Sequence, residues 1–328
     1  MHRFLIVRLG SLGDVVHAIP TAAALRAHFP DARIDWAVDP RYLEVLDLVR
    51  GLDGRVGINT RSPAALGTVR DLRSARYDAA IDLQGLVKSA VLARAAGADR
   101  TIGFPPAQLR EPLARFLYTH TPDVQAAHVV FKNLALLEPL GVRGPRVEFP
   151  LDNVPTDASE QVAASAGARR YVLINPGAAW PNKRWPPASF GALAAAIRER
   201  FELRSVVLWG PGEESLAAAI VEASSNAAQL APRTVVTDVF ALAREARLMI
   251  SGDTGPLHIA GAVGTPTVSL FGPTDPGRNG PWSPADIALS RYSVCSCHYQ
   301  RRCRRQASCI DEIGVGEVVA AIERRIRG

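Results

Sequence analysis

Acidic, basic and thiol side chains stand beside glycines at several points where short hydrophobic runs of the chain end. The first such point is RLGSLGDVV, in which Ser11, Gly13 and Asp14 follow the hydrophobic run at 4–9. Glycines and a helix start allow close approach of an anion. The motif lacks the third glycine of the dinucleotide fingerprint and the Gly-Lys-Ser/Thr of a P-loop. Asp14 is therefore either a helix cap or a general base beside a ligand.

A second motif, NPGAAWPNKRWP, carries Gly177, Ala178 and Lys183 after the hydrophobic run at 171–174. A lysine is a point charge suited to phosphate, and the start of the following helix adds N–H donors. The motif thus predicts a phosphate-binding loop. The alternative is a basic surface loop flanked by packing tryptophans.

A third motif, SGDTGPLH, places Asp253, Thr254, Gly255 and His258 between a strand-like run and a helix start. Backbone amides at such a turn can hold a diphosphate. Asp253 would then accept from sugar hydroxyls or orient the loop, and a lone histidine in this place is more often structural than catalytic. The turn at 271–276 either closes the same site or is purely structural.

Two cations of the first half follow the same kind of strand exit. Lys88 lies in DLQGLVKS and Arg110 begins REPLAR. Together they predict an anionic acceptor site. Taken separately, each is an ordinary surface cation.

All four cysteines lie within fifteen residues, in the pattern C-x-C-x5-C-x5-C. Thiolates bind zinc or iron, and clustering in a chain without a secretion signal favours a metal over disulfides. The sequence therefore predicts a structural zinc or iron, with disulfides or free thiols as the alternative. The expected ligands are Cys295, Cys297, Cys303 and Cys309.

These motifs need elements that place them at one edge of a sheet. Hydrophobic runs that end in Gly, Asp or Pro alternate with helical patterns, as expected of a parallel sheet covered on both faces. We expect strands at 4–9, 33–39, 77–85, 171–177, 205–211, 248–253 and 267–273, and helices at 86–96, 187–201, 213–224 and 315–326. Two such series predict an α/β protein of two Rossmann-like, doubly wound domains.

Length and composition agree with that organisation. The 328 residues suggest two domains, and 48% hydrophobic residues exclude intrinsic disorder. The sequence shows no signal peptide and no transmembrane run, so we expect a cytoplasmic protein. A net charge of +6 fits either an anionic partner or simple solubility. Only the basic run at 301–305 would suit nucleic acid, and we expect no nucleic-acid partner.

Taken together, the motifs resemble those of the family-9 glycosyltransferases, the ADP-heptose lipopolysaccharide heptosyltransferases. RLGSLGDVVHAIP, NPGAAWPNKRWP and SGDTGPLHIAGAVGTPTVSLFGPTDP carry the resemblance, which covers nearly the whole chain. DLQGLVKSA and LREPLARFLY are similar to the heptosyltransferase I branch. The resemblance implies a GT-B fold, with an acceptor-binding domain at 1–153, a nucleotide-sugar-binding domain at 154–312, and a C-terminal helix at 313–328 that returns toward the first domain.

The resemblance also implies an activity: inverting transfer of L-glycero-D-manno-heptose from ADP-heptose to the Kdo region of lipid A, in lipopolysaccharide inner-core synthesis, without a catalytic cofactor. Other acceptors of the family are a second core heptose or a protein. The enzyme would work at the cytoplasmic surface of the inner membrane. Asp14 and Lys183 would be catalytic. The donor would contact Gly13, Gly177, Ala178, Glu213 (or Glu214, one residue along), Asp253, Thr254, Gly255 and His258, and the acceptor Ser11, Lys88 and Arg110.

Overall fold

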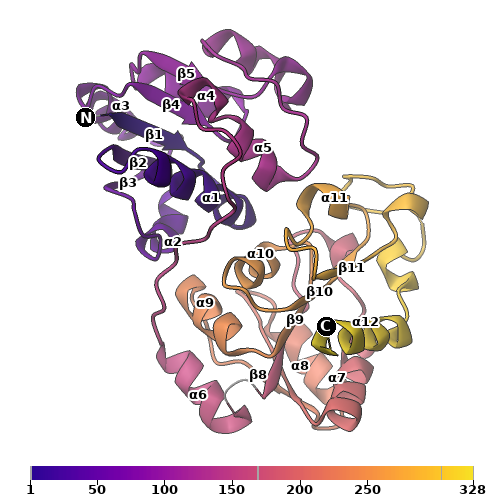
Figure 1. Ribbon diagram of the computed structural model, residues 1–328. Helices are drawn as coiled ribbons and strands as arrows, with labels where there is room; N and C mark the ends of the chain where they lie inside the picture. The colour runs from indigo at the N-terminus through magenta and orange to yellow at the C-terminus, as the bar shows by residue number, and fades with distance from the viewer. Residues whose placement is uncertain (1, 168–169, 304, 328) are drawn as a thin grey trace. The chain divides into compact units, whose positions relative to one another are not determined.

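The chain divides into two compact units, residues 1–152 and 153–328 (Figure 1). The computed structural model describes residues 2–167, 170–303 and 305–327. Each unit has its own parallel sheet with helices around it. Two Rossmann-like units are what the alternating strand and helix patterns predict.

The sheet of the N-terminal unit has the order β3-β2-β1-β4-β5, with every neighbouring pair parallel. Its strands are β1 (Arg3–Val7), β2 (Arg33–Val38), β3 (Gly54–Gly57), β4 (Ala79–Asp82) and β5 (Arg100–Ile102). Its α-helices are α1 (Leu12–His28), α2 (Leu43–Asp47), α3 (Ala65–Ser74), α4 (Val87–Ala95) and α5 (Val129–Ala135). The chain runs from β1 outward to β3 and then returns to β4 on the other side of β1.

The sheet of the C-terminal unit has the order β11-β10-β9-β6-β7-β8, again parallel throughout. Its strands are β6 (Tyr171–Asn175), β7 (Arg204–Val207), β8 (Ala228–Leu230), β9 (Leu248–Gly252), β10 (Thr267–Phe271) and β11 (Ile287–Ser290). Its α-helices are α6 (Asp157–Ala166), α7 (Pro187–Phe201), α8 (Glu214–Ala223), α9 (Val236–Glu245), α10 (Gly255–Ala262), α11 (Pro276–Asn279) and α12 (Val315–Arg327).

Burial explains why the central strands read as unbroken hydrophobic runs. All residues of β4, β6, β9 and β10 are buried, because helices cover both faces of a parallel sheet. The core of the C-terminal unit includes Trp185, Phe190 and Ile322, from the loop before α7, α7 itself and α12. The amphipathic segment predicted at 315–326 is thus a core-packing helix, which contacts α7 and β10 within this unit.

Chain order reverses between β1 and β4 in the first sheet, and between β6 and β9 in the second. Ligands of doubly wound folds bind beyond the carboxyl ends of the strands at such a switch point. Asp14 follows β1 and Lys88 follows β4, whereas Lys183 follows β6 and Asp253 follows β9. The topology therefore places these four predicted residues at the switch points of the two sheets.

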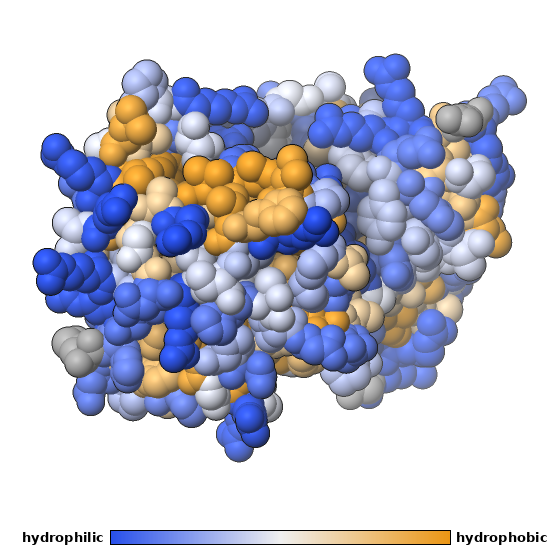
Figure 2. Space-filling view, turned by 90° about the horizontal axis from the view of Figure 1, so that it is seen from above, coloured by the Kyte–Doolittle hydropathy of each residue, from blue (hydrophilic) through white to orange (hydrophobic). Residues whose placement is uncertain are grey.

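The face of the molecule shown in Figure 2 is mostly hydrophilic, with hydrophobic residues that are partly scattered and partly grouped. None of the helices in the described ranges combines the length and the hydropathy that crossing a bilayer requires.

Candidate functional site

Asp14 lies in the first turn of α1, with both carboxylate oxygens engaged. Oδ1 lies 2.6 Å from the Arg8 guanidinium. Oδ2 accepts from the backbone N–H of Ser11 at 3.1 Å and from its hydroxyl at 3.0 Å. The Asp14 side chain is still 38% exposed, so solvent or a ligand can reach it. Asp14 therefore does cap the helix, and it also keeps an accessible face.

The charge of Asp14 depends on Arg8. Burial raises the pKa of Asp14, but the attraction of the Arg8 guanidinium and the Ser11 hydrogen bonds outweigh it, so the pKa lies below the ordinary value. Arg8 itself is buried and donates to the carbonyl of Leu83. Asp14 is thus an ionised carboxylate at neutral pH, which is the state a proton acceptor needs.

The loops after β1 and β4 are joined by hydrogen bonds. The Leu9 N–H donates to the Gln84 side chain at 2.9 Å. Asp82, fully buried, accepts from the N–H groups of Gln84 and Gly85 and from the hydroxyl of Tyr118. Burial raises the pKa of Asp82, and its hydrogen bonds only partly offset this. Asp82 therefore orders the turn that precedes α4.

The two cations predicted for the acceptor lie on neighbouring elements. Lys88 is exposed in the first turn of α4, and Arg110 is exposed just before the 3₁₀ helix Pro112–Leu117. The Glu111 carboxylate accepts from the Val87 N–H at 2.7 Å, which ties the two segments together. The structure therefore brings together the two segments that carry the predicted cations.

Gly10 shows why the first motif needs glycine. Its φ is +152°, and a Cβ there would lie 2.7 Å from the ring of Tyr42. Any side chain at this position would displace that ring, which lies directly against the turn leading to Asp14.

Lys183 is the centre of a charged network in the C-terminal unit. Its Nζ lies 2.6 Å from Oδ2 of Asp253 and 4.5 Å from the ring centre of Trp180. The other Asp253 oxygen is 3.5 Å from Nε2 of His258. Burial raises the pKa of Asp253, but the His258 hydrogen bond and the Lys183 charge outweigh it and lower the pKa. The carboxylate thus holds a lysine, seventy residues away in sequence, at the end of β9.

A buried amide links the two loops of this site. Asn175, the last residue of β6, donates to the hydroxyls of Ser251 at 3.0 Å and Thr254 at 2.9 Å. Thr254 is the N-cap of α10, and Gly255 begins that helix. Asn175 therefore fixes the start of α10 relative to the Gly177 loop.

Glu213 lies next to the Gly177 loop. Its carboxylate accepts from the Gly210 N–H at 3.1 Å, and a Cβ on Gly177 would come within 2.3 Å of it. Arg184 donates to the carbonyl of Ala178 at 2.8 Å and lies 3.9 Å from Glu213. Glu214 is exposed at the start of α8, so Glu213 is the carboxylate that faces this loop.

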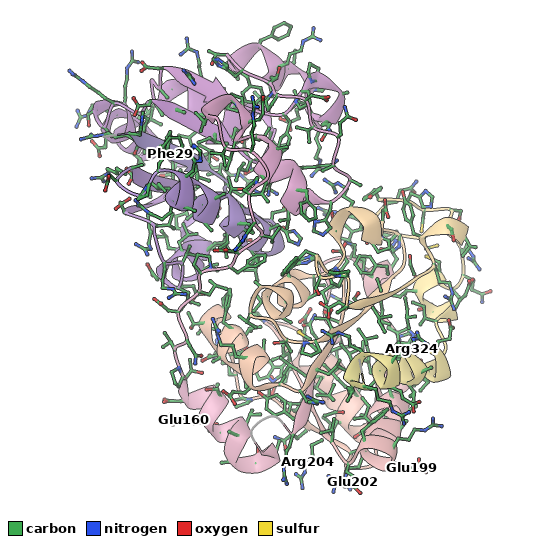
Figure 3. The ribbon with its side chains drawn as sticks, viewed as in Figure 1. Phe29, Glu160, Glu199, Glu202, Arg204 and Arg324 are labelled. Atoms are coloured by element: carbon green, nitrogen blue, oxygen red, sulfur yellow. The ribbon has the colours of Figure 1, made fainter. Side chains whose placement is uncertain are left out.

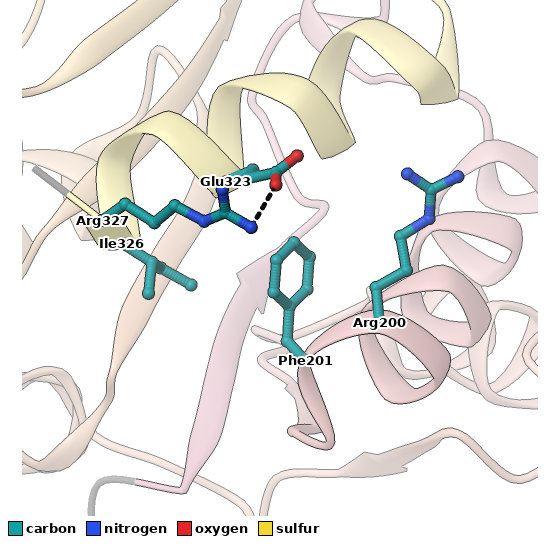
Figure 4. Close-up of a pocket in the computed structure, with 5 residues that line it drawn as sticks. All are labelled: Arg200, Phe201, Glu323, Ile326 and Arg327. Carbon is teal, nitrogen blue, oxygen red and sulfur yellow. Dashed lines mark ion pairs between the residues drawn. The ribbon is translucent and has the colours of Figure 1, made fainter.

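The site gathers past the carboxyl ends of the strands, at the edge opposite Arg204. That residue, labelled in Figure 3, begins β7 and marks the amino edge of the same sheet. A hollow of about 410 Å³ lies elsewhere, between α7 and α12 (Figure 4). The residues that line this hollow are Arg200, Phe201, Glu323, Ile326 and Arg327. None of them is a predicted site residue.

The cysteines form one cluster of free thiols rather than disulfides. The sulfur atoms of Cys295, Cys297 and Cys309 are buried and lie within 4.8 Å of one another, with Cys303 packed against them at intermediate burial. Burial, with the neighbouring thiols, raises the pKa of Cys309 to about 12. Arg304, in the basic run of this loop, lies outside the described residues.

Asn182 links the cysteine cluster to the Lys183 loop. Buried Asn182 donates to the Gln300 carbonyl at 2.8 Å and to Sγ of Cys297 at 3.7 Å. Lys183 is the next residue in the chain. The cysteine loop therefore supports the segment that carries Lys183, a link that the sequence alone does not reveal.

Each unit also brings to its own site residues that were not among those predicted from the sequence. They are Arg8, Asn175, Asn182 and Arg184. Arg8 and Asn175 lie at or just after the end of a buried hydrophobic run, and Arg184 is a cation beside Lys183, so the sequence did carry a signal for these three. Asn182 had no such signal.

Comparisons with known proteins agree with this geometry. Residues 66–308 match the sequence model of glycosyltransferase family 9 (heptosyltransferase). Lipopolysaccharide heptosyltransferase 1 of Pseudomonas aeruginosa is 29% identical over 320 residues, covering 93% of this chain and 88% of that protein. Lipopolysaccharide heptosyltransferase 3 of Escherichia coli is 28% identical over 332 residues, covering 95% of this chain and 96% of that protein.

Among solved structures, the E. coli heptosyltransferase WaaC with ADP superposes with a TM-score of 0.76 at 23% identity, covering 98% of this chain and 99% of that one. This likeness confirms the predicted GT-B fold of two Rossmann-like units. The family match spans most of the chain and includes the Lys183 loop, Asp253 and three of the four cysteines. The protein is therefore a glycosyltransferase and belongs to glycosyltransferase family 9, the heptosyltransferase family.

Proposed function

We propose that this glycosyltransferase moves L-glycero-D-manno-heptose from ADP-heptose to the Kdo region of lipid A, with inversion at the anomeric carbon. The observation that carries the proposal is the pair of charged centres at the two switch points. One is an ionised, accessible carboxylate, Asp14, and the other is a largely buried cation, Lys183. Glycosyl transfer to an alcohol needs a proton acceptor and a site that stabilises a leaving diphosphate.

Asp14 would act as the general base. An acceptor hydroxyl has a pKa far above 7, so its proton must leave as the new bond forms. In the proposed step, the hydroxyl oxygen bonds to the anomeric carbon and its proton passes to Asp14. The bond from that carbon to the β-phosphate oxygen breaks, and ADP leaves with the electron pair. Arg8 keeps Asp14 ionised and oriented before the reaction.

Lys183 would stabilise the departing ADP. The diphosphate would replace or share the contact that Asp253 makes with this lysine, and the amides at the start of α10 add partial positive charge. The proposed diphosphate site also includes Thr254, Gly255 and His258, at the start of α10. In the Gly177 loop, Gly177 and Ala178 would contact the nucleotide. Glu213 is placed to accept from ribose hydroxyls. These groups supply the charge without a catalytic cofactor.

The acceptor would meet Ser11, Lys88 and Arg110. Kdo and the phosphates of lipid A are anionic, which matches the two exposed cations. Because that acceptor is membrane-embedded, the enzyme would work as a peripheral protein on the cytoplasmic surface of the inner membrane.

The deciding experiment is transfer from ADP-heptose to Kdo₂-lipid A, followed by mass spectrometry. A mass gain of one heptose is expected, with an inverted anomeric configuration in the product. No gain despite calorimetric binding of ADP-heptose would move the acceptor to a heptosylated core or a protein. No binding would overturn the donor assignment.

The alternative acceptor has an observation in its favour. The chain resembles heptosyltransferases 1 and 3 to nearly the same degree. The same assay with a heptosylated core oligosaccharide therefore belongs beside the first one.

We further propose that the cysteine cluster holds a structural zinc or iron ion. The donor set fits: three buried sulfurs within 4.8 Å of one another suit the S₄ tetrahedron that both metals accept, with Cys303 as the fourth ligand. Metal binding would deprotonate the thiols, and nearby Arg305 would offset part of the negative charge. The ion would brace the loop beside Asn182 and take no part in glycosyl transfer.

A further inference from the structure

Large hydrophobic side chains are exposed on two neighbouring elements of the N-terminal unit. Leu113 is 69% exposed and Phe116 is 70% exposed, both in the 3₁₀ helix Pro112–Leu117, and Val91 of α4 is 49% exposed. This 3₁₀ helix packs against α4. In Figure 2, hydrophobic residues gather in one cluster on the upper face of this unit, with hydrophilic residues around them.

Local geometry explains why these side chains point outward together. In a 3₁₀ helix, residues three apart lie on the same face, so Leu113 and Phe116 are aligned. Ala114, between them, is buried and anchors the helix. The Glu111 carboxylate caps the start of α4 and fixes the two elements to each other. Val91, Leu113 and Phe116, here called the ridge, are therefore exposed on two elements that are fixed to each other.

Cations surround this ridge. Lys88 and Arg94 lie three residues on either side of Val91, on the same exposed face of α4. The Arg115 guanidinium stacks over the Phe116 ring at 4.4 Å. The two elements thus carry three cations, and the two residues just before the 3₁₀ helix add Arg110 and the carboxylate of Glu111, which already accepts a hydrogen bond.

We propose that this ridge, formed by Val91, Leu113 and Phe116, docks the protein on an anionic phospholipid bilayer. The side chains of the ridge would enter the boundary between headgroups and acyl chains, while Arg94 and Arg115 pair with lipid phosphates. Lys88 and Arg110 would remain for the acceptor. The aromatic ring beneath an arginine suits the headgroup level, where amphipathic groups gather. The inference rests on the proposed lipid-linked acceptor, and it names the surface that brings the acceptor site to the membrane.

The first test is flotation of the full chain with vesicles that contain no acceptor. We expect wild-type protein to float with phosphatidylcholine vesicles containing one quarter phosphatidylglycerol, less with pure phosphatidylcholine, and less again at high salt. The double variant Leu113→Ser/Phe116→Ser should bind the anionic vesicles about 10-fold more weakly, since it removes two large apolar side chains. Val235→Ser, which changes a 58% exposed valine of the C-terminal unit, is the matched control and should bind as wild type.

The second test is activity with acceptor in two forms. The double variant should transfer heptose to a deacylated, water-soluble acceptor at the wild-type rate, and several-fold more slowly to acceptor embedded in anionic vesicles. Equal melting temperatures for the three proteins would show that the folds are intact. Wild-type flotation by the double variant, or equal binding to neutral and anionic vesicles, would overturn the docking surface. Vesicle binding as expected without transfer to either acceptor would instead overturn the proposed reaction and leave the docking surface standing.

Discussion

The two oxygens of Asp14 have different partners, which allows the base and cap roles of this residue to be separated. Replacing Asp14 with Asn keeps the shape, and the amide oxygen can still accept from Ser11, but the variant loses the proton acceptor and the charge that faces Arg8. We expect kcat to fall by about 10²- to 10⁴-fold, while ADP-heptose affinity stays nearly unchanged. Steady-state kinetics and calorimetry measure the two quantities.

Ser11→Ala is the control for the cap. It removes one hydrogen bond to Asp14 but leaves the carboxylate and Arg8 in place. We expect a loss of about 0.5–2 kcal/mol in unfolding free energy. Most of kcat should be retained, whereas the KM for the acceptor should rise, because Ser11 is proposed to contact the acceptor. If kcat fell to a similar degree in Asp14→Asn and Ser11→Ala, Asp14 would act only as a helix cap and not as the general base.

Lys183 is expected to act on the donor phosphates. Lys183→Met keeps an apolar stem against Trp180 and removes the charge. ADP should bind more weakly, and kcat/KM should fall by about 10²-fold or more, because the leaving group loses its cation. Unchanged kinetics would remove Lys183 from the donor site. Lys183→Arg, which retains the charge, should recover part of the activity.

Asp253 links stability to pH. Its pKa is lowered in the folded protein, so its ionised form stabilises the fold above the ordinary aspartate pKa. That contribution is lost as the pH falls through the lowered, folded-state pKa. Asp253→Asn would leave Lys183 without its buried partner and should cost roughly 3 kcal/mol at pH 7.

Denaturant unfolding of wild type and Asp253→Asn at several pH values provides the measurement. The difference between the two proteins should shrink as the pH drops below the ordinary aspartate range. If the difference in unfolding free energy between the two proteins stayed constant as the pH fell below the ordinary aspartate pKa, the Asp253 charge would not stabilise the fold.

Among the elements, the loop that carries the cysteines is expected to depend on the proposed zinc or iron ion. Cys297→Ser should lower zinc or iron content from about one ion per chain and reduce the melting temperature by several degrees. Metal analysis and thermal unfolding test this. Ser296→Ala is the matched control, because it changes an exposed neighbour and keeps all four thiols. A purified wild type of full stability without metal would contradict the proposal.

Some strands and helices can be predicted from the sequence more readily than others. The helix predicted at 187–201 is α7, Pro187–Phe201, and the runs at 171–177, 248–253 and 267–273 contain β6, β9 and β10. Buried parallel strands must be hydrophobic on both faces, so each can be recognised from its own sequence, without knowing which strand pairs with it. The strands β3, β5, β8 and β11 were not predicted. They are the edge strands of the two sheets, each of three or four residues, and their burial is incomplete.

For the molecule as a whole, the division at residue 152 predicts that donor binding belongs to one unit. Apart from Gly13, every residue proposed to contact the donor lies in 153–328. A fragment of residues 153–328 should therefore fold, bind ADP within about tenfold of the full-length affinity, and show no transfer. Isothermal titration tests it, with the 1–152 fragment as the control that should not bind. If the 153–328 fragment folded but did not bind ADP, the first unit would have to contribute to the donor site.

Neighbouring residues were enough to predict the α/β class, the two Rossmann-like units, the motif loops at the strand exits and the clustered thiols. These properties depend on local hydrophobic period, on glycine at turns and on residue type, all of which can be read along the chain. The contacts of the site could not be read in this way. Lys183 meets Asp253 across seventy residues because β6 and β9 pair in parallel register, with Asn175 beside Ser251. Arg8 turns toward Asp14, Glu213 rather than Glu214 faces Gly177, and Asn182 reaches the cysteines, because side-chain direction follows from how distant segments pack.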